Sequence, residues 1–108
     1  MTLIYCVDID GTICNNSKDG NYISVIPNPD RIAKINNLYD EGHYIIYLTA
    51  RGMSRYKNSR VAAHNEFYNF TYNQLRSWGC RFHELHMGKP AADIYVDDKG
   101  VNDNDFFN

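Results

Sequence analysis

The chain has 108 residues, of which 44% are hydrophobic and 22% charged, and its formal net charge is −2. This length suits a single domain, residues 1–108, and the charge disfavours a nucleic-acid partner. No apolar run reaches membrane-spanning length and no leader segment is apparent, so we expect a cytoplasmic protein without a membrane partner. The three cysteines have no metal-binding spacing, and their odd number argues against a disulfide framework.

The first third of the chain predicts a strand, a flap and a helix. The continuous apolar run 3–7 is typical of a parallel strand that is covered on both faces. The polar stretch 13–26 contains turn signals and is expected to form a small hairpin flap, with residues 22–25 as one arm. Asn28 followed by Pro29 predicts the start of a helix.

That helix is expected to end at Gly42, and the apolar run 44–48 predicts the second strand. Residues 51–60 form a basic loop, and 61–70 favour a helix. Thr71 and Gln74 fit a capping box, which predicts that a separate helix begins at Thr71. The remaining expected elements are two strands and a short terminal helix, at 82–87, 92–96 and 103–107.

Strands that alternate with helices imply a parallel sheet with right-handed crossovers, and therefore an α/β fold of the Rossmann type. In such sheets, ligands bind at the carboxyl ends of the strands. Asp8, Thr49 and Asp97 each come where a predicted strand ends, and Lys89 follows another strand. We therefore expect these four side chains to gather at one edge of the sheet.

Four motifs occur in a fixed order along the chain, and together they supply carboxylates, a hydroxyl and an ammonium group. They are Asp-Ile-Asp-Gly-Thr at 8–12, Leu-Thr-Ala-Arg at 48–51, Gly-Lys-Pro at 88–90 and Val-Asp-Asp at 96–98. The ordered set resembles the phosphatases of the haloacid dehalogenase (HAD) superfamily, from Tyr5 to about Lys99. Within that superfamily the chain resembles the small capless proteins associated with capsule or other surface-polysaccharide biosynthesis. The resemblance implies a three-layer HAD-like sandwich with a central parallel sheet, a small flap after the first strand and no cap domain.

The first motif carries the expected chemistry. Asp8 is the candidate nucleophile, since a carboxylate can attack a phosphate ester to give an aspartyl-phosphate. Asp10 is the candidate acid and base, which protonates the leaving oxygen and then deprotonates the attacking water. Gly11 allows a tight turn, so that neighbouring amides can bind phosphate oxygens.

The cofactor expected here is Mg²⁺, because it prefers oxygen ligands and keeps several waters. Asp8 and the backbone carbonyl of Asp10 would bind it, and Asp97 would complete the site. Asp98 is either a second ligand or an outer group, and the resemblance favours Asp97 for direct contact.

The second and third motifs would hold the phosphoryl group. Thr49 and the amide of Ala50 are expected to hydrogen-bond it, and Lys89 to neutralise its charge. In the basic loop, Arg51 and Arg55 are candidates for contact with an anionic substrate, although a solvated loop would have the same composition.

The sequence thus predicts a Mg²⁺-dependent phosphomonoesterase that acts on a phosphorylated sugar or a related small metabolite. Two alternatives stay open: a polynucleotide 3′-phosphatase, whose DNA end would fit an open site, and a non-catalytic binding module of the same fold. Because a capless site is open to solvent, a second copy of the chain is a candidate to cover it.

Overall fold

A parallel three-stranded sheet forms the centre of the chain, in a computed structural model that describes all of residues 1–108. In chain order the elements are β1 (Ile4–Asp8), the 3-10 helix η1 (Tyr22–Ser24), α1 (Pro29–Asp40), β2 (Tyr44–Thr49), α2 (Arg60–Ser77), β3 (Glu84–Met87) and α3 (Asp103–Phe107). β2 lies between β1 and β3, and the register aligns Asp8 with Leu48 and Thr49 with Met87. The strands therefore end together at one edge. This confirms the expected α/β, Rossmann-like fold without a cap.

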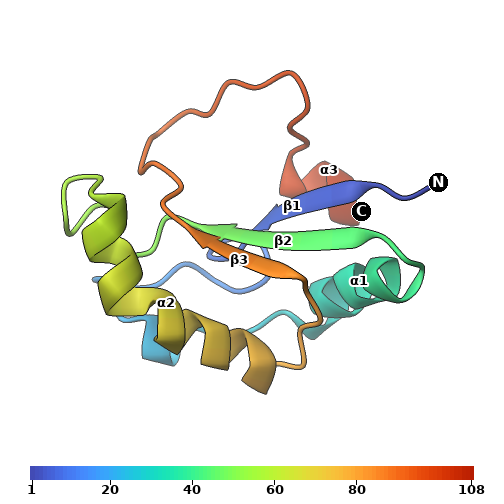
Figure 1. The fold of residues 1–108 in the computed structure, drawn as a ribbon, viewed down its shortest axis with the longest axis horizontal. Coiled ribbons are helices and arrows are strands. Elements are labelled where there is room, and N and C mark those ends of the chain that lie inside the picture. The colour runs from blue at the N-terminus through green and yellow to red at the C-terminus, as the bar shows by residue number, and fades with distance from the viewer.

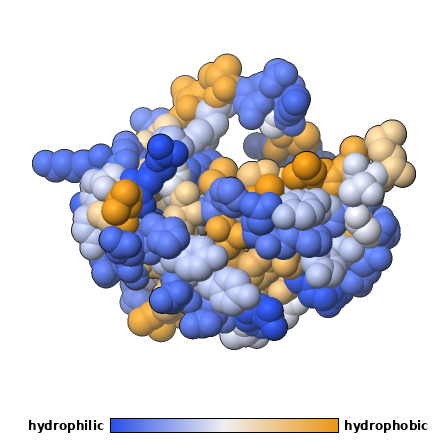
Figure 2. Space-filling model, viewed as in Figure 1, coloured by the Kyte–Doolittle hydropathy of each residue, from blue (hydrophilic) through white to orange (hydrophobic).

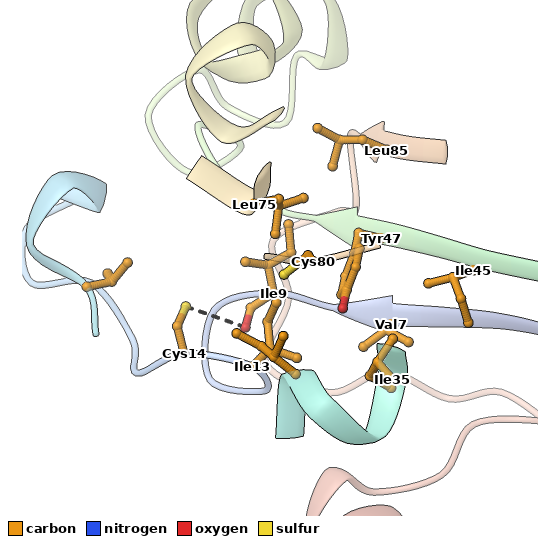
Figure 3. Close-up of a cluster of buried hydrophobic side chains, with 12 residues drawn as sticks. Val7, Ile9, Ile13, Cys14, Ile35, Ile45, Tyr47, Leu75, Cys80 and Leu85 are labelled. Atoms are coloured by element: carbon orange, nitrogen blue, oxygen red, sulfur yellow. Dashed lines mark hydrogen bonds between the residues drawn. The ribbon is translucent and has the colours of Figure 1, made fainter. Parts of the chain in front are cut away.

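Both long helices lie on the same face of the sheet, as Figure 1 shows. The reason is that both crossovers are right-handed and step in the same direction, from β1 to β2 to β3. The side chains between this face and the helices form the core shown in Figure 3, which includes Val7, Ile35, Ile45, Tyr47, Leu75 and Leu85. The opposite face is not covered by a long helix, so a single chain supplies two of the three expected layers. None of the helices is both long and apolar enough to cross a membrane.

Helix α1 begins and ends where the sequence predicts. The Asn28 side chain caps it by accepting a backbone N–H bond from its first turn at 3.1 Å, and Pro29 is its first residue. Gly42, at a φ of 96°, follows its last turn. The terminal helix α3 also forms, and the Phe106 ring lies edge-on to Tyr5 at 6.0 Å, so α3 packs back on the core.

Three predictions of local structure are wrong, the first two in α2 and in the flap. Residues 60–77 form one continuous helix capped by Ser59, so no separate helix starts at Thr71. Thr71 is instead fully buried in the middle of α2, where its hydroxyl pairs with a guanidinium group rather than with a helix terminus. In the flap, residues 22–24 form η1 rather than a strand arm, because the Asn21 side chain caps a turn there.

The predicted strand 92–96 is also absent. The residues between β3 and α3 form an extended arm, residues 88–102, which rises from the sheet and returns to α3 (Figure 1). A parallel strand needs a crossover of about a dozen residues or more. Only four residues, 88–91, separate β3 from the predicted strand. The segment is therefore too close to β3 along the chain to join the same sheet in parallel.

Candidate active site

Asp8 ends β1 with its side chain between an ammonium group and a hydroxyl. Lys89 Nζ lies 3.3 Å from Asp8 Oδ1, and the Thr12 hydroxyl donates to Oδ2 at 3.2 Å. Burial raises the pKa of the Asp8 carboxyl above its usual range, and Lys89 and Thr12 oppose that rise. The side chain is still 30% exposed, so a ligand can reach it. The structure thus brings Asp8 and Lys89 together as the sequence predicts.

Asp10 is held by a buried arginine from the end of the neighbouring strand. Arg51 Nε donates to Asp10 Oδ2 at 2.9 Å, and Nη2 donates to Oδ1 at 3.0 Å. A bidentate pair of this kind fixes the plane of the carboxylate as well as its position. The Cys14 thiol donates to the same Oδ1 at 3.4 Å, and burial raises the pKa of this thiol to about 12, so it stays protonated.

Arg51 lies in the interior, and this differs from its predicted contact with substrate. It is only 1% exposed, and its Nη1 donates to the Thr71 hydroxyl at 3.3 Å and to Gln74 Oε1 at 2.7 Å. The Tyr22 ring covers the guanidinium at 4.6 Å, and Gln74 Nε2 donates to the Tyr22 carbonyl at 2.8 Å. In this arrangement Arg51 orients Asp10 and joins it to α2 and the flap.

The sequence alone does not identify the partners of Arg51. Thr71 and Gln74 lie one turn apart on α2, so they share a helix face. Their spacing fits a capping box, but the same spacing also places two polar side chains side by side on one continuous helix. Tyr22 carried no signal, because its role depends on how the flap folds.

Thr49 is fully buried, and its hydroxyl accepts the backbone N–H of Arg51 at 3.1 Å. The hydroxyl keeps its own hydrogen for donation. The Lys89 amide donates to the Thr49 carbonyl at 3.1 Å, which anchors the lysine beside the end of β2. Thr49 therefore orients both the arginine and the lysine of the site.

The backbone amides of Asp10 and Ala50, which follow β1 and β2, have no hydrogen-bond partner within the chain. Unpaired amides next to a carboxylate and an ammonium group suit the binding of phosphate oxygens. The Gly11 amide differs from expectation, since it donates to the Cys14 carbonyl at 2.9 Å. Gly11 instead serves the turn: its φ is 82°, and an added Cβ would lie 2.9 Å from Asn16 Oδ1.

A polar pocket of about 460 Å³ lies between the flap and the loop after β2. The lining residues come from the flap and from the loop, and they are Ser17, Asp19, Gly20 and Tyr22, and Ala50, Gly52, Ser54 and Arg55. Arg55 is 49% exposed, stacks on the Phe67 ring at 5.2 Å and lies 3.5 Å from Glu66. The predicted role of Arg55 in substrate contact is compatible with this position.

The oxygen donors at the end of β1 fit Mg²⁺ in type. The Asp8 carboxylate is partly exposed, and the backbone carbonyl of Asp10 accepts no hydrogen bond. Both carboxylate oxygens of Asp10, however, are occupied by Arg51. Within one chain, then, Asp8 is the more accessible carboxylate at this edge, with 30% of its side chain exposed against 18% for Asp10.

Asp97 and Asp98 do not join this group in the structure. Both lie on the exposed arm, where Asp97 accepts the Lys99 amide at 2.8 Å. No cluster of three or more potential metal-binding side chains forms anywhere in the chain. The structure thus assembles the first three motifs and leaves the fourth outside.

Comparison with solved structures supports the expected fold. A crystal structure of a protein from Vibrio cholerae superimposes with a TM-score of 0.88 and 25% identity, over 99% of this chain and 88% of that one. The D,D-heptose 1,7-bisphosphate phosphatase from B. bronchiseptica, crystallised with magnesium and phosphate, superimposes with a TM-score of 0.55 and 21% identity. That match covers 86% of this chain and 52% of the phosphatase. No family model matches the chain, and no curated protein matches it. By its fold, then, the chain is similar to both of these proteins and has the expected Rossmann-like architecture without a cap.

Proposed function

We propose that this chain is a Mg²⁺-dependent phosphomonoesterase that forms an aspartyl-phosphate on Asp8. The observation that carries the proposal is the placement of the Asp8 carboxylate 3.3 Å from Lys89, at a strand end with two unpaired amides. A phosphate bound there would meet a nucleophile, a cation and two N–H donors at once. Positioning and electrostatic stabilisation supply most of the catalysis in phosphoryl transfer.

In the first step Asp8 attacks phosphorus, the bond from phosphorus to the ester oxygen breaks, and the phosphoryl group moves to Asp8. Asp10 gives a proton to the departing oxygen. In the second step Asp10 takes a proton from water as that water attacks the phosphorus. The acyl-phosphate bond then breaks, which restores Asp8 and releases inorganic phosphate.

The remaining groups act on charge and orientation. Lys89 and the amides of Asp10 and Ala50 bind the phosphoryl oxygens, and Arg51 holds Asp10 in the orientation that proton transfer needs. Asp8 and the Asp10 carbonyl would hold Mg²⁺, and Asp97 would complete the site, with Asp98 beside it, when the arm that carries them reaches the strand ends. When bound, the ion would reduce the repulsion between the phosphate and the anionic nucleophile.

The proposed substrate is a phosphorylated sugar or a related small metabolite. The pocket next to Ala50 is lined mostly by polar groups, among them Ser17, Asp19 and Ser54, and these can hydrogen-bond hydroxyl groups. The fold similarity to a heptose bisphosphate phosphatase favours the same class.

The polynucleotide 3′-phosphatase is the less favoured reading, because the basic loop does not present a continuous cationic surface. Arg51 is buried, and Arg55 lies against Glu66. The non-catalytic binding module is also less favoured, since it needs neither Asp8 beside a lysine nor an oriented Asp10.

The test is phosphate release from a panel of phosphorylated sugars, nucleotides and DNA 3′-phosphate ends, with and without Mg²⁺. We expect Mg²⁺-dependent release that is fastest with a small phosphosugar and absent in Asp8→Asn. Release from DNA ends alone would favour the second reading. No release from any member of the panel would favour the binding module.

A further inference from the structure

The arm, residues 88–102, has a composition that does not fit its exposed position. Ile94 is 78% exposed, Val96 is 94% exposed, and Tyr95 between them is half exposed. Figure 2 shows hydrophobic atoms on the part of the molecule that rises above the sheet. A β-branched and aromatic run of this kind favours a paired strand, and its exposure to water is unfavourable. We therefore expect this segment to pair with another strand of the protein and to become covered there.

The chain's own sheet cannot receive this segment in parallel. Lys89 is anchored at the carboxyl ends of the strands by its bonds to Thr49 and Asp8. To run parallel to β1, the segment would have to begin near the other end of the sheet and on the far side of β1. At roughly 3.5 Å per residue, the few residues after Lys89 span less than about 20 Å, and no crossover helix is present.

A matching surface exists on every copy of the chain. β1 pairs only with β2, so its outer edge has unpaired N–H and C=O groups. The face that carries Ile4 and Cys6 is open, and Ile4 is 71% exposed. A free edge of this kind is a template for an extended segment from another chain.

We propose that two copies of this chain exchange their arms. Residues 92–96 of each copy pair in parallel with β1 of the other copy, as a fourth strand. The following Asp97 and Asp98 then reach the second copy's Asp8, and each site is built from two chains. The role given to Asp97 rests on the proposed function, whereas the strand pairing does not.

The register and the length of the arm agree with this exchange. When Asp97 lies beside Asp8 in a parallel ladder, Tyr95 lies beside Cys6 and Asp93 lies beside Ile4. The residues that lead to and from the paired segment, 89–92 and 97–103, can extend roughly 10 and 20 Å at about 3.5 Å per residue, so the exchange places the strand ends of the two copies close together across a two-fold axis. Asp103 of α3 is held by Arg31 at 2.6 Å, so the far end of the arm stays on its own chain.

The exchange also explains why one chain leaves its site incomplete. Asp8 is the more exposed of the two carboxylates at the strand ends, and both oxygens of Asp10 already accept bonds from Arg51. A second carboxylate that arrives from the partner's arm would supply the charge that a divalent cation needs. A two-fold arrangement gives both copies the same contact, so the assembly closes as a dimer.

The first test is complementation between two inactive variants. Asp8→Asn and Asp97→Asn chains, co-expressed with different tags, are purified through both tags to isolate the mixed dimer. One of its two sites then has Asp8 and Asp97 intact, so we expect about half of the wild-type rate per dimer. Mixed dimers with no more activity than either variant alone, beside an active wild type, would overturn the proposal.

The second test does not depend on activity. Tyr95→Cys places a thiol beside the native Cys6 of the second copy, and a short dimaleimide should link the chains into a dimer band on a denaturing gel. Cys6→Ser in the same background should abolish the band. Val101→Cys, on the same arm but outside the paired segment, should give none.

Light scattering of the untreated wild type should report a dimer. A monomer at the concentrations used for cross-linking, or a band that persists without Cys6, would overturn the proposal. If no phosphate ester is hydrolysed, the proposed function fails, and the cross-link and the solution mass still decide whether the arms exchange.

Discussion

Two nitrogens of Arg51 donate to the two oxygens of the Asp10 carboxylate, at 2.9 and 3.0 Å, and the arginine is only 1% exposed. Arg51 therefore orients Asp10, the proposed proton donor and acceptor. It also joins the end of β2 to α2 through Thr71 and Gln74. A lysine has a single ammonium group and cannot reproduce this geometry.

Arg51→Met should accordingly destabilise the protein by about 3–5 kcal/mol, because it leaves a carboxylate partly buried without its cation. Arg51→Lys should keep more of the stability and still lose most of the activity. Urea denaturation and kcat/KM measure the two effects. The matched control is Arg55→Lys, whose half-exposed pair with Glu66 should change stability by less than about 0.5 kcal/mol. Equal effects at both arginines would contradict this role for Arg51.

Asp8→Asn should abolish hydrolysis and, without divalent metal, make the protein more stable at neutral pH. Because burial raises the folded-state pKa of Asp8, its protonated form favours the fold. That contribution is complete at low pH and is lost as the pH rises through the raised pKa. Thermal melts in chelator at pH 4 and pH 8 should therefore show the larger gain for the variant at pH 8. A variant that melts below the wild type at pH 8 would show that the Lys89 contact outweighs burial.

Asp10→Asn should slow both the formation and the breakdown of the aspartyl-phosphate, by roughly 10²–10⁴-fold, because proton transfer is lost in each step. Rapid-quench measurements of phosphoenzyme and free phosphate separate the steps. Asp105→Asn, an exposed carboxylate on α3, is the control. A variant that slows only one step would restrict Asp10 to one of its two proposed roles.

Removal of divalent metal should abolish activity and leave the fold intact, since the core holds no metal-binding cluster. The measurement is turnover and circular dichroism in excess chelator, followed by addition of Mg²⁺. Activity that survives chelation would remove the ion from the mechanism.

Gly52→Ala should destabilise the loop that carries Arg51. Gly52 has a φ of 79°, and a Cβ there would lie 2.7 Å from the Phe67 ring and 3.2 Å from the Ala63 Cα on α2. Gly42→Ala is the matched control, because Gly42 also has a positive φ but has open space around it. Both changes add backbone strain, so the difference between their free energies of unfolding reports the steric clash alone. A difference near zero would mean that Phe67 moves aside freely.

The sequence predicted those parts of the fold whose signals are local. The run 3–7 and the pair Asn28 and Pro29 determine a strand and a helix start by themselves, and both form. The strand 92–96 has equally good local signals, but a strand also needs an edge that the chain can reach. Whether the chain can reach such an edge depends on the length of the connection, and the local residue pattern does not indicate this.

In the site, too, the sequence predicted the contacts that the order of the strands determines, and not those that depend on distant segments. Asp8 and Lys89 follow strands, so topology alone brings them together. The burial of Arg51 depends instead on α2 and the flap, which are distant in sequence and meet only in the folded chain. A charged residue in a basic stretch therefore looked exposed from the sequence and is internal in the structure.

The Tyr22 ring over Arg51 has a consequence for turnover. Movement of the flap away from α2 would break the bond from Gln74 to the Tyr22 carbonyl and expose a guanidinium that is only 1% exposed. Asp10 would then lose its fixed orientation whenever the entrance widened. We therefore expect the site to favour substrates that reach Asp8 without displacing the flap.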